Sequence, residues 1–191
     1  MKHHSFLFLA AGFEEIEALT VVDVMRRAGM DVKTVSITAS KEVCGAHGIK
    51  VVADTTFTET DFSDAEWLII PGGMPGASNL ASFEPLNDLL KAHAPDGKIA
   101  AICAAPAVVL APLGILDGKE ATCYPGFEDQ CDKAVMRDVP IVVLDSLITA
   151  NGPSAALPFA LAIVASSLGA NIAQQIGSGM LHYPKSVNFY F

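Results

Sequence analysis

Cys103 stands at a point where a reactive thiol is expected. It ends an apolar run, residues 98–103, that reads as a buried strand, and it is followed by Ala104-Ala105-Pro106 at the start of a helical pattern. A strand that turns abruptly into a helix exposes its last side chain, as in a nucleophile elbow. The helix dipole favours a thiolate there and predicts a pKa below the free value of about 8.5. The alternative is a buried cysteine that packs as a small apolar side chain.

Glu17 is the candidate acid or base. In the helix predicted over residues 15–28 it heads a column of apolar side chains, namely Val21, Val24 and Ala28. A carboxyl group in that position is partly desolvated, which raises its pKa. In its protonated form it would donate a hydrogen bond to a thiolate or exchange a proton with a substrate. The alternative is a carboxylate that turns to solvent at the start of the helix. The neighbouring Glu14 and Glu15 suit the first helical turn, where carboxylates complement the helix dipole.

Backbone N–H groups near Cys103 are the third candidate feature. Gly72 and Gly73 follow a strand predicted over residues 67–70, and glycine permits backbone geometry that other residues avoid. Their N–H groups, with that of Ala104, could face a developing oxyanion. The alternative is an ordinary tight turn.

The remaining cysteines and histidines show no metal-binding or CxxC spacing. We expect free thiols, with Cys123 near a further strand end and Cys131 exposed in an acidic loop. Cys44 and His47 share one loop and offer two ligands at most, so no metal site is predicted. Neither G-x-G-x-x-G nor G-x-x-x-x-G-K-[ST] occurs, and no nucleotide cofactor is expected.

Apolar strands alternate with helical patterns along the chain. Strands are predicted over residues 6–11, 32–37, 67–70, 98–103, 141–144 and 147–150, a hairpin strand or excursion over 48–53, and helices over 15–28, 85–94, 104–113, 154–168 and 172–180. This order predicts an α/β fold: a doubly wound sandwich whose mostly parallel sheet has helices on both faces. Because the carboxyl ends of parallel strands meet at one edge, Glu17, Gly72 and Cys103 are expected to converge there.

Composition narrows the class of protein. The chain has 191 residues, which predicts a single domain over 1–191, and a net charge of −9. The acidic balance argues against binding nucleic acid or an anionic membrane. The mean hydropathy is +0.42, but the longest apolar run, residues 99–113, contains Pro106 and Pro112 and is shorter than the roughly 20 residues of a spanning helix. The first residues mimic an export signal only faintly, so a cytoplasmic location is expected.

Taken in order, these motifs resemble the ThiJ/PfpI superfamily, most closely the branch of the parkinsonism-associated protein and its bacterial relatives. The matching segments are FLAAGFEEIE (8–17), VDVMRRAG (22–29), IPGG (70–73), AAICAAP (100–106) and Gly152-Pro153 before FALAIV (159–164). The resemblance implies a flavodoxin-like sandwich, usually a homodimer. It also implies an oxidation-prone nucleophile at Cys103, a protonated partner at Glu17 and an oxyanion pocket from Gly73 and Ala104.

Some positions depart from the pattern of that superfamily. Tyr124 stands where some members carry a pocket histidine, which we take as a candidate substrate contact. His47 stands near a family arginine, so contacts between subunits could differ. Residues 183–191 have no obvious counterpart.

Three functions remain open. The first, implied by the resemblance, is a cofactor-independent glyoxalase or deglycase that acts on methylglyoxal, glyoxal or their early adducts with amines and thiols, with a role in carbonyl or oxidative stress. The second is a non-enzymatic redox sensor or chaperone that uses the same cysteine. The third is a cysteine peptidase or amidase, which needs a histidine base that only His93 or His182 could bring through the fold.

Overall fold

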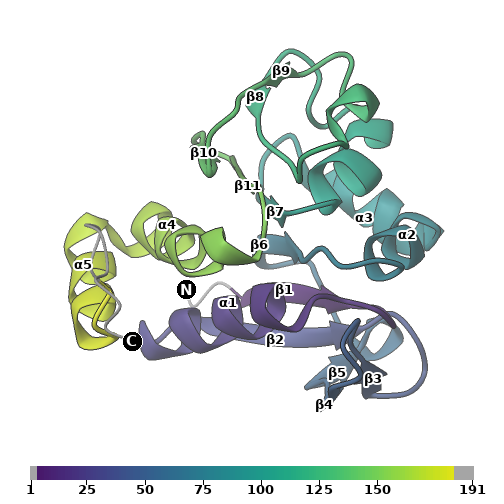
Figure 1. Cartoon of the computed structure of the whole chain (residues 1–191). Coiled ribbons are helices and arrows are strands. Elements are labelled where there is room, and N and C mark those ends of the chain that lie inside the picture. Colours follow the sequence, from purple (N-terminus) through teal and green to yellow (C-terminus); the bar gives the residue numbers. More distant parts are fainter. Residues whose placement is uncertain (1–3, 183–191) are drawn as a thin grey trace, which may run out of the picture.

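The computed structural model describes residues 4–182, which form one large sheet with helices on both faces (Figure 1). The unmatched segment 183–191 lies outside the described residues. The seven strands, in spatial order, are β10 (Ile141–Val143), β11 (Leu147–Ala150), β7 (Lys98–Ile102), β6 (Ala65–Ile70), β1 (His4–Leu9), β2 (Asp31–Ser36) and β5 (Thr55–Thr56). All neighbours are parallel except the pair β10–β11. The predicted mostly parallel, flavodoxin-like sandwich is therefore confirmed.

Residues 4–182 hold five α-helices. They are α1 (Glu15–Arg27), α2 (Gly76–Ala81), α3 (Glu84–His93), α4 (Ala156–Leu168) and α5 (Ala170–Gly179). Helix α5 packs on α4, and the others cover the two faces of the sheet. Helices α1 and α4 pack together on one face, and α2 and α3 lie together away from them (Figure 1). Strand β1 shows why both faces need cover: Leu7 and Leu9 belong to one buried cluster, and Phe6 and Phe8 to the other. Strands buried on both faces explain the high hydropathy of the chain.

The smaller elements refine the sequence predictions. The hairpin expected around residues 48–53 exists as β3 (Glu42–Cys44) paired antiparallel with β4 (Lys50–Val52). Helix α1 is followed by Gly29 with a positive φ of 75°, which ends the helix as predicted. Two further short strands, β8 (Glu120–Ala121) and β9 (Val135–Met136), form a separate parallel pair.

The helix predicted over residues 104–113 is wrong in type. The structure has a π-helical turn, Pro106–Leu110, followed by a 3₁₀ turn, Ala111–Leu113. The N–H of Ala111 reaches back five residues to the carbonyl of Pro106, and Pro112 has no N–H to continue an α-helical ladder. Between residues 4 and 182, no helix is long and apolar enough to cross a bilayer.

Candidate active site

The candidate site lies where the order of the strands changes side. After β1 the chain adds β2 and β5 on one side of it, and then β6 and β7 on the other. Strand β1 is in the middle, with β2 on one side and β6 on the other, so the carboxyl ends of β1 and β6 flank a topological switch point. Strand β6 leads into Pro71-Gly72-Gly73, and β7 beside it leads into Cys103. The predicted convergence of these strand ends is what the structure shows.

Cys103 has the backbone of a strained elbow. Its φ is +66°, a left-handed conformation that non-glycine residues seldom adopt. Two hydrogen bonds hold it: its N–H donates to the carbonyl of Ala150 at 2.8 Å, and its carbonyl accepts from the N–H of Tyr124 at 2.8 Å. The residue is 8% exposed. The backbone of Cys103 is thus held by β11 on one side and by Tyr124 on the other, and this fixes the direction of the thiol.

Glu17 is fully buried, so it does not turn to solvent. The N–H of Gly72 donates to its Oε2 at 2.8 Å, and the Cys103 thiol is also its hydrogen-bond partner, while Oε1 has no partner in the chain. Burial raises the pKa of Glu17 from 4.5 to about 7, against the hydrogen bonds from Cys103 and Gly72, which lower it. The raised pKa predicted from the helical spacing is therefore supported, and the carboxyl group can change its protonation state near neutral pH.

The lowered pKa expected for Cys103 is wrong. Burial, followed by the nearby charge of Glu17, raises the pKa of the thiol from 9.0 to about 12. The helix-start environment contributes in the expected direction, since the N–H groups of Gly73 and Ala104 lower this pKa, but they do not outweigh desolvation. The resting residue at neutral pH is a thiol whose proton must be removed during attack.

The structure separates the roles of the two glycines. The N–H groups of Gly73 and Ala104 both point at the Cys103 sulfur, so they are placed to bind an oxyanion formed on an atom attached to it. Gly73 has a φ of +88°, which glycine adopts without strain. The N–H of Gly72 is engaged by Glu17, so its predicted oxyanion role is wrong: Gly72 positions the carboxyl group.

An open pocket of about 480 Å³ gives access to Cys103. Tyr124 is 45% exposed and lines this pocket, which fits the expectation of a substrate contact. The other lining residues are Glu14, Glu15, Ile16, His47, Ile49 and Pro153. The walls are mostly apolar, and the pocket has room for a small aldehyde.

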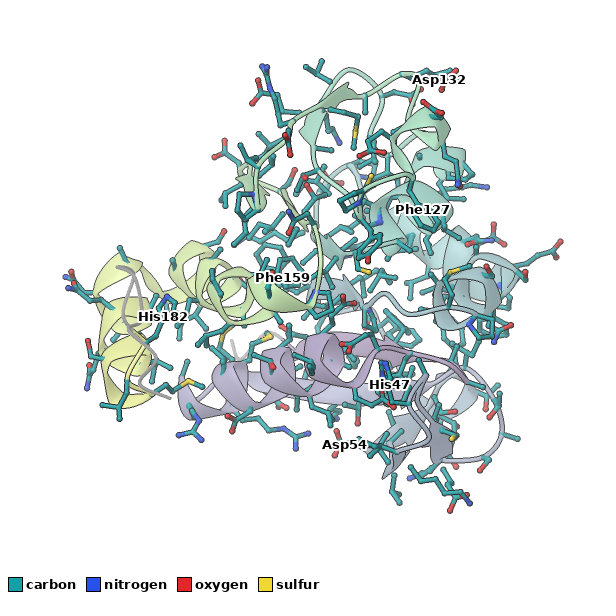
Figure 2. The ribbon with its side chains drawn as sticks, in the orientation of Figure 1. His47, Asp54, Phe127, Asp132, Phe159 and His182 are labelled. Atoms are coloured by element: carbon teal, nitrogen blue, oxygen red, sulfur yellow. The ribbon has the colours of Figure 1, made fainter. Side chains whose placement is uncertain are left out.

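One wall of the pocket, the Glu15–His47 pair, was not singled out from the sequence. His47 Nδ1 lies 2.7 Å from Glu15 Oε2, and the His47 N–H donates to Oε1 at 2.8 Å. Figure 2 shows His47 beside the first turn of α1. The hydrogen bond to Glu15 raises the pKa of His47. Burial acts to raise the pKa of Glu15, but hydrogen bonds from His47 and Ile49 hold it below 4.5. Two residues 32 positions apart gave no local sequence signal.

Glu14, Glu15 and His47 also have atoms within 4.8 Å of one another, a spacing that could hold a metal ion. Their contacts within the chain already use these groups. Glu14 accepts the Glu17 N–H at 2.7 Å, which caps α1, and Glu15 is bound by His47. The reactive groups of the pocket are therefore the Cys103 thiol and the Glu17 carboxyl group.

The other candidates lie elsewhere. His93 hydrogen-bonds the N–H of Lys98, the first residue of β7, at the opposite end of that strand from Cys103, and His182 follows α5. Cys44 is exposed, and Cys123 is buried two residues after β8. The expectation of an exposed Cys131 is wrong: it is 3% exposed and belongs to the core cluster that contains Cys123.

Comparisons with known proteins agree with this architecture. A DJ-1 homologue of Arabidopsis thaliana, homolog B, is 36% identical over 186 residues, which are 95% of this chain and 42% of that protein. The chain thus spans less than half of that relative. The glutathione-independent glyoxalase DJR-1.2 of Caenorhabditis elegans is 36% identical over 154 residues, covering 79% of this chain and 81% of the relative.

The solved structure of oxidized Toxoplasma gondii DJ-1 superposes with a TM-score of 0.89 at 34% identity, covering 94% of this chain and 98% of that one. The sequence profile of the DJ-1/PfpI family matches residues 4–166. With an elbow cysteine, a buried glutamate and a glycine turn meeting at the switch point of a flavodoxin-like sheet, this chain belongs to the DJ-1/PfpI family.

Proposed function

We propose that the protein is a cysteine-dependent, cofactor-independent enzyme of the glyoxalase or deglycase type, acting on methylglyoxal, glyoxal or their early adducts with amines and thiols. One observation carries the proposal: the Cys103 thiol faces a pocket for small molecules, with the Glu17 carboxyl group and two N–H donors directed at it. The glyoxalase name of the nematode relative points to the same chemistry.

The first step is attack on the aldehyde. The Glu17 carboxylate takes the thiol proton as the Cys103 sulfur bonds to the aldehyde carbon, and the carbonyl oxygen becomes an oxyanion held by the N–H groups of Gly73 and Ala104. Protonation of that oxygen gives a hemithioacetal. Because Glu17 has a pKa of about 7, it serves as base or acid at neutral pH at little cost.

The second step moves a proton between adjacent carbons. Glu17 removes the hydrogen from the carbon bonded to sulfur, which gives an enediolate, and the hydroxyl proton on that carbon passes to the neighbouring oxygen. Glu17 returns its proton to the neighbouring carbon, which leaves a thioester of Cys103 and a 2-hydroxy acid. Water then adds to the thioester, the C–S bond breaks, and the hydroxy acid and the thiol are released. No electrons are exchanged with an outside partner.

The decisive test is production of lactate from methylglyoxal by purified protein. The wild type should form lactate without glutathione, and Cys103→Ser should lose the activity by at least a thousandfold, since a serine hydroxyl is a far weaker nucleophile. Cys44→Ser is the matched control, because Cys44 is exposed and outside the pocket. Equal turnover by wild type and Cys103→Ser would refute the mechanism.

A redox sensor remains the second candidate. The two N–H groups directed at the Cys103 sulfur could also bind the oxygens of a sulfinate, which favours oxidation at this residue. Mild peroxide followed by mass spectrometry should then add oxygen at Cys103. A protein that keeps Cys103 unmodified under these conditions is not such a sensor.

A peptidase or amidase needs a histidine base. His47 lines the pocket with its Nδ1 bound to Glu15, but the side chain that contacts the Cys103 thiol is Glu17. A peptide-hydrolysis assay that stays silent while methylglyoxal is converted would exclude this third function.

We also propose that two copies associate, as the resemblance implies. Large aliphatic side chains are exposed on α1 and on the β3–β4 hairpin with its connecting loop, namely Ile16, Leu19, Ile49 and Val52. Burying such side chains against a second copy would remove them from water.

A further inference from the structure

Cys123 and Cys131 form a buried thiol pair in the segment between β8 and β9. They are 4% and 3% exposed, and their side chains are hydrogen-bond partners. The Cys123 sulfur also lies 3.5 Å from the carbonyl oxygen of Tyr124. Both are free, and both belong to the same core cluster. Neither takes part in the mechanism proposed above, and neither has CxxC spacing.

A series of tight turns brings the two residues together. The N–H of Phe127 donates to the carbonyl of Tyr124 at 3.2 Å, and the N–H of Cys131 donates to that of Glu128 at 2.8 Å. Strands β8 and β9 pair with each other on either side of this segment. Figure 2 shows Phe127 and Asp132 in the same upper part of the molecule. These turns and the β8–β9 pairing fold the segment back on itself, and Cys123 and Cys131, eight residues apart, lie in the same core cluster.

We propose that Cys123 and Cys131 are a modification site: a hydroperoxide oxidises them to a reversible disulfide, independently of Cys103. The hydrogen bond from Cys123 lowers the pKa of Cys131 and raises that of Cys123, so Cys131 supplies the thiolate. In this arrangement one thiol is activated by its future bonding partner.

The oxidation balances without another reactant. The Cys131 thiolate attacks one peroxide oxygen, the O–O bond breaks, and the second oxygen leaves as water or an alcohol after taking up the proton that Cys131 had lost. The Cys123 sulfur then attacks the sulfenic sulfur of Cys131, the S–S bond forms, and the hydroxyl group leaves as water with the Cys123 proton. The two thiols together lose two electrons, and the hydroperoxide gains them.

A small cavity explains why the oxidant must be a small molecule. A pocket of about 200 Å³ reaches Cys123, the hydrogen-bond partner of Cys131, and is lined also by Pro125, Glu128 and Asn151. This pocket has room for a hydroperoxide. The burial of both sulfurs hinders a larger oxidant, such as a peptide that carries a disulfide. The bond would also fix the segment that carries Tyr124, a wall of the Cys103 pocket.

Mass spectrometry of the full-length protein tests the proposal. After treatment with hydrogen peroxide and alkylation of free thiols, trypsin should release the peptide 120–133, which holds both cysteines and no internal Lys or Arg. We expect this peptide to be two hydrogens lighter and unalkylated, and to be alkylated twice after dithiothreitol. Cleavage after Glu128 separates the cysteines only when the bond is reduced. Cys103→Ser and Cys44→Ser should behave as wild type, and Cys131→Ser should not form the bond.

Other results would overturn the proposal. They are oxygen added to Cys123 or Cys131 without a bond between them, a bond from either residue to Cys44 or Cys103, or full alkylation of both thiols after peroxide has already modified Cys103. The mass of the wild-type peptide alone shows whether the disulfide forms, so the test does not depend on whether Cys131→Ser folds. Because Cys103→Ser should keep the disulfide and lose lactate formation, failure here is distinguishable from failure of the proposed function.

Discussion

Glu17 and Cys103 meet in a buried space where a second negative charge is unfavourable. The pKa values of about 7 and about 12 mean that, above pH 7, the resting pair is a carboxylate beside a thiol. Attack on a carbonyl moves the proton to Glu17 and the negative charge to the substrate oxygen, where Gly73 and Ala104 bind it. The high pKa of the thiol is thus compatible with catalysis, because the thiolate need not accumulate.

The rate of lactate formation should follow the protonation of Glu17. Only the carboxylate can accept the thiol proton, so kcat/KM should rise about tenfold per pH unit below pH 7 and level off above it. The Glu17→Gln variant, which cannot act as a base, should be at least a hundredfold slower, with no step near pH 7. A wild-type profile that is flat from pH 5 to pH 8 would contradict this assignment.

The same carboxyl group should make stability depend on pH. Its pKa is about 7 when folded and near 4.5 when unfolded, so the folded state binds the proton more tightly. This contribution is fully present below pH 4.5 and is lost as the pH rises through 7; it amounts to about 3 kcal/mol. Glu17→Gln mimics the neutral form, so urea unfolding should show it gaining stability relative to wild type between pH 4.5 and pH 8. A constant difference between the two proteins over this range would contradict the raised pKa.

The sequence predicted which residues form the site better than it predicted their pKa values. Helical spacing identified Glu17 as a buried carboxyl group, and the strand end identified Cys103. The pKa of Cys103 was predicted in the wrong direction because the helix dipole is local, whereas desolvation depends on everything packed around the sulfur. The Glu15–His47 pair and the burial of Cys131 depend on contacts between distant segments and left no trace in local spacing.

The turn after β6 packs directly against both reactive side chains. A Cβ atom at Gly72 would lie 2.6 Å from Cys103 Cβ and 2.7 Å from Glu17 Oε2. Gly72→Ala should therefore displace one of these side chains, lower kcat at least tenfold, and destabilise the fold by about 1–3 kcal/mol. Lactate assays and thermal unfolding measure both effects.

Gly179, at the end of α5, provides the control for this substitution. A Cβ there would meet nothing within 4 Å, so Gly179→Ala should leave activity unchanged and stability equal or slightly higher. If Gly72→Ala were as active as Gly179→Ala, the tight packing of the glycine against the thiol and the carboxyl group would have no functional role.

The sequence predicted the type of an element correctly where its apolar pattern was long and regular. The prediction was wrong where a proline interrupts the pattern. The buried strands and α1 appear close to their predicted bounds because their apolar patterns are long and uninterrupted. Residues 104–113 have a helical pattern, yet Pro112 removes a backbone donor from its interior, and the chain forms a π turn followed by a 3₁₀ turn. The short helix α2 begins after Pro75 and lacks enough residues to show a period.

At the scale of the whole molecule, strand order explains why one site forms. Residues of three segments far apart in sequence reach one sheet edge because β1, β6 and β7 are neighbours and parallel. The alternation of strands and helices predicted a parallel sheet, and the resemblance supplied its flavodoxin-like arrangement. The pocket above this edge is bounded by α1, the loop after β3 and Tyr124, so its walls depend on segments whose contacts no local pattern specifies.

The exposed aliphatic side chains near this pocket are suited to an interface between two copies of the chain. If a second copy covers α1 and the β3–β4 hairpin, light scattering after size-exclusion chromatography should give twice the mass of the chain. Val52 on β4 is 75% exposed and does not line the pocket, so Val52→Asp should shift the protein toward monomer by placing a charge in an apolar contact. Val143→Asp, on the edge strand β10 at 54% exposure, is the matched control and should remain a dimer. A wild type that stays monomeric at high micromolar concentration, or a dimer that only Val143→Asp dissociates, would place these side chains outside any interface between copies.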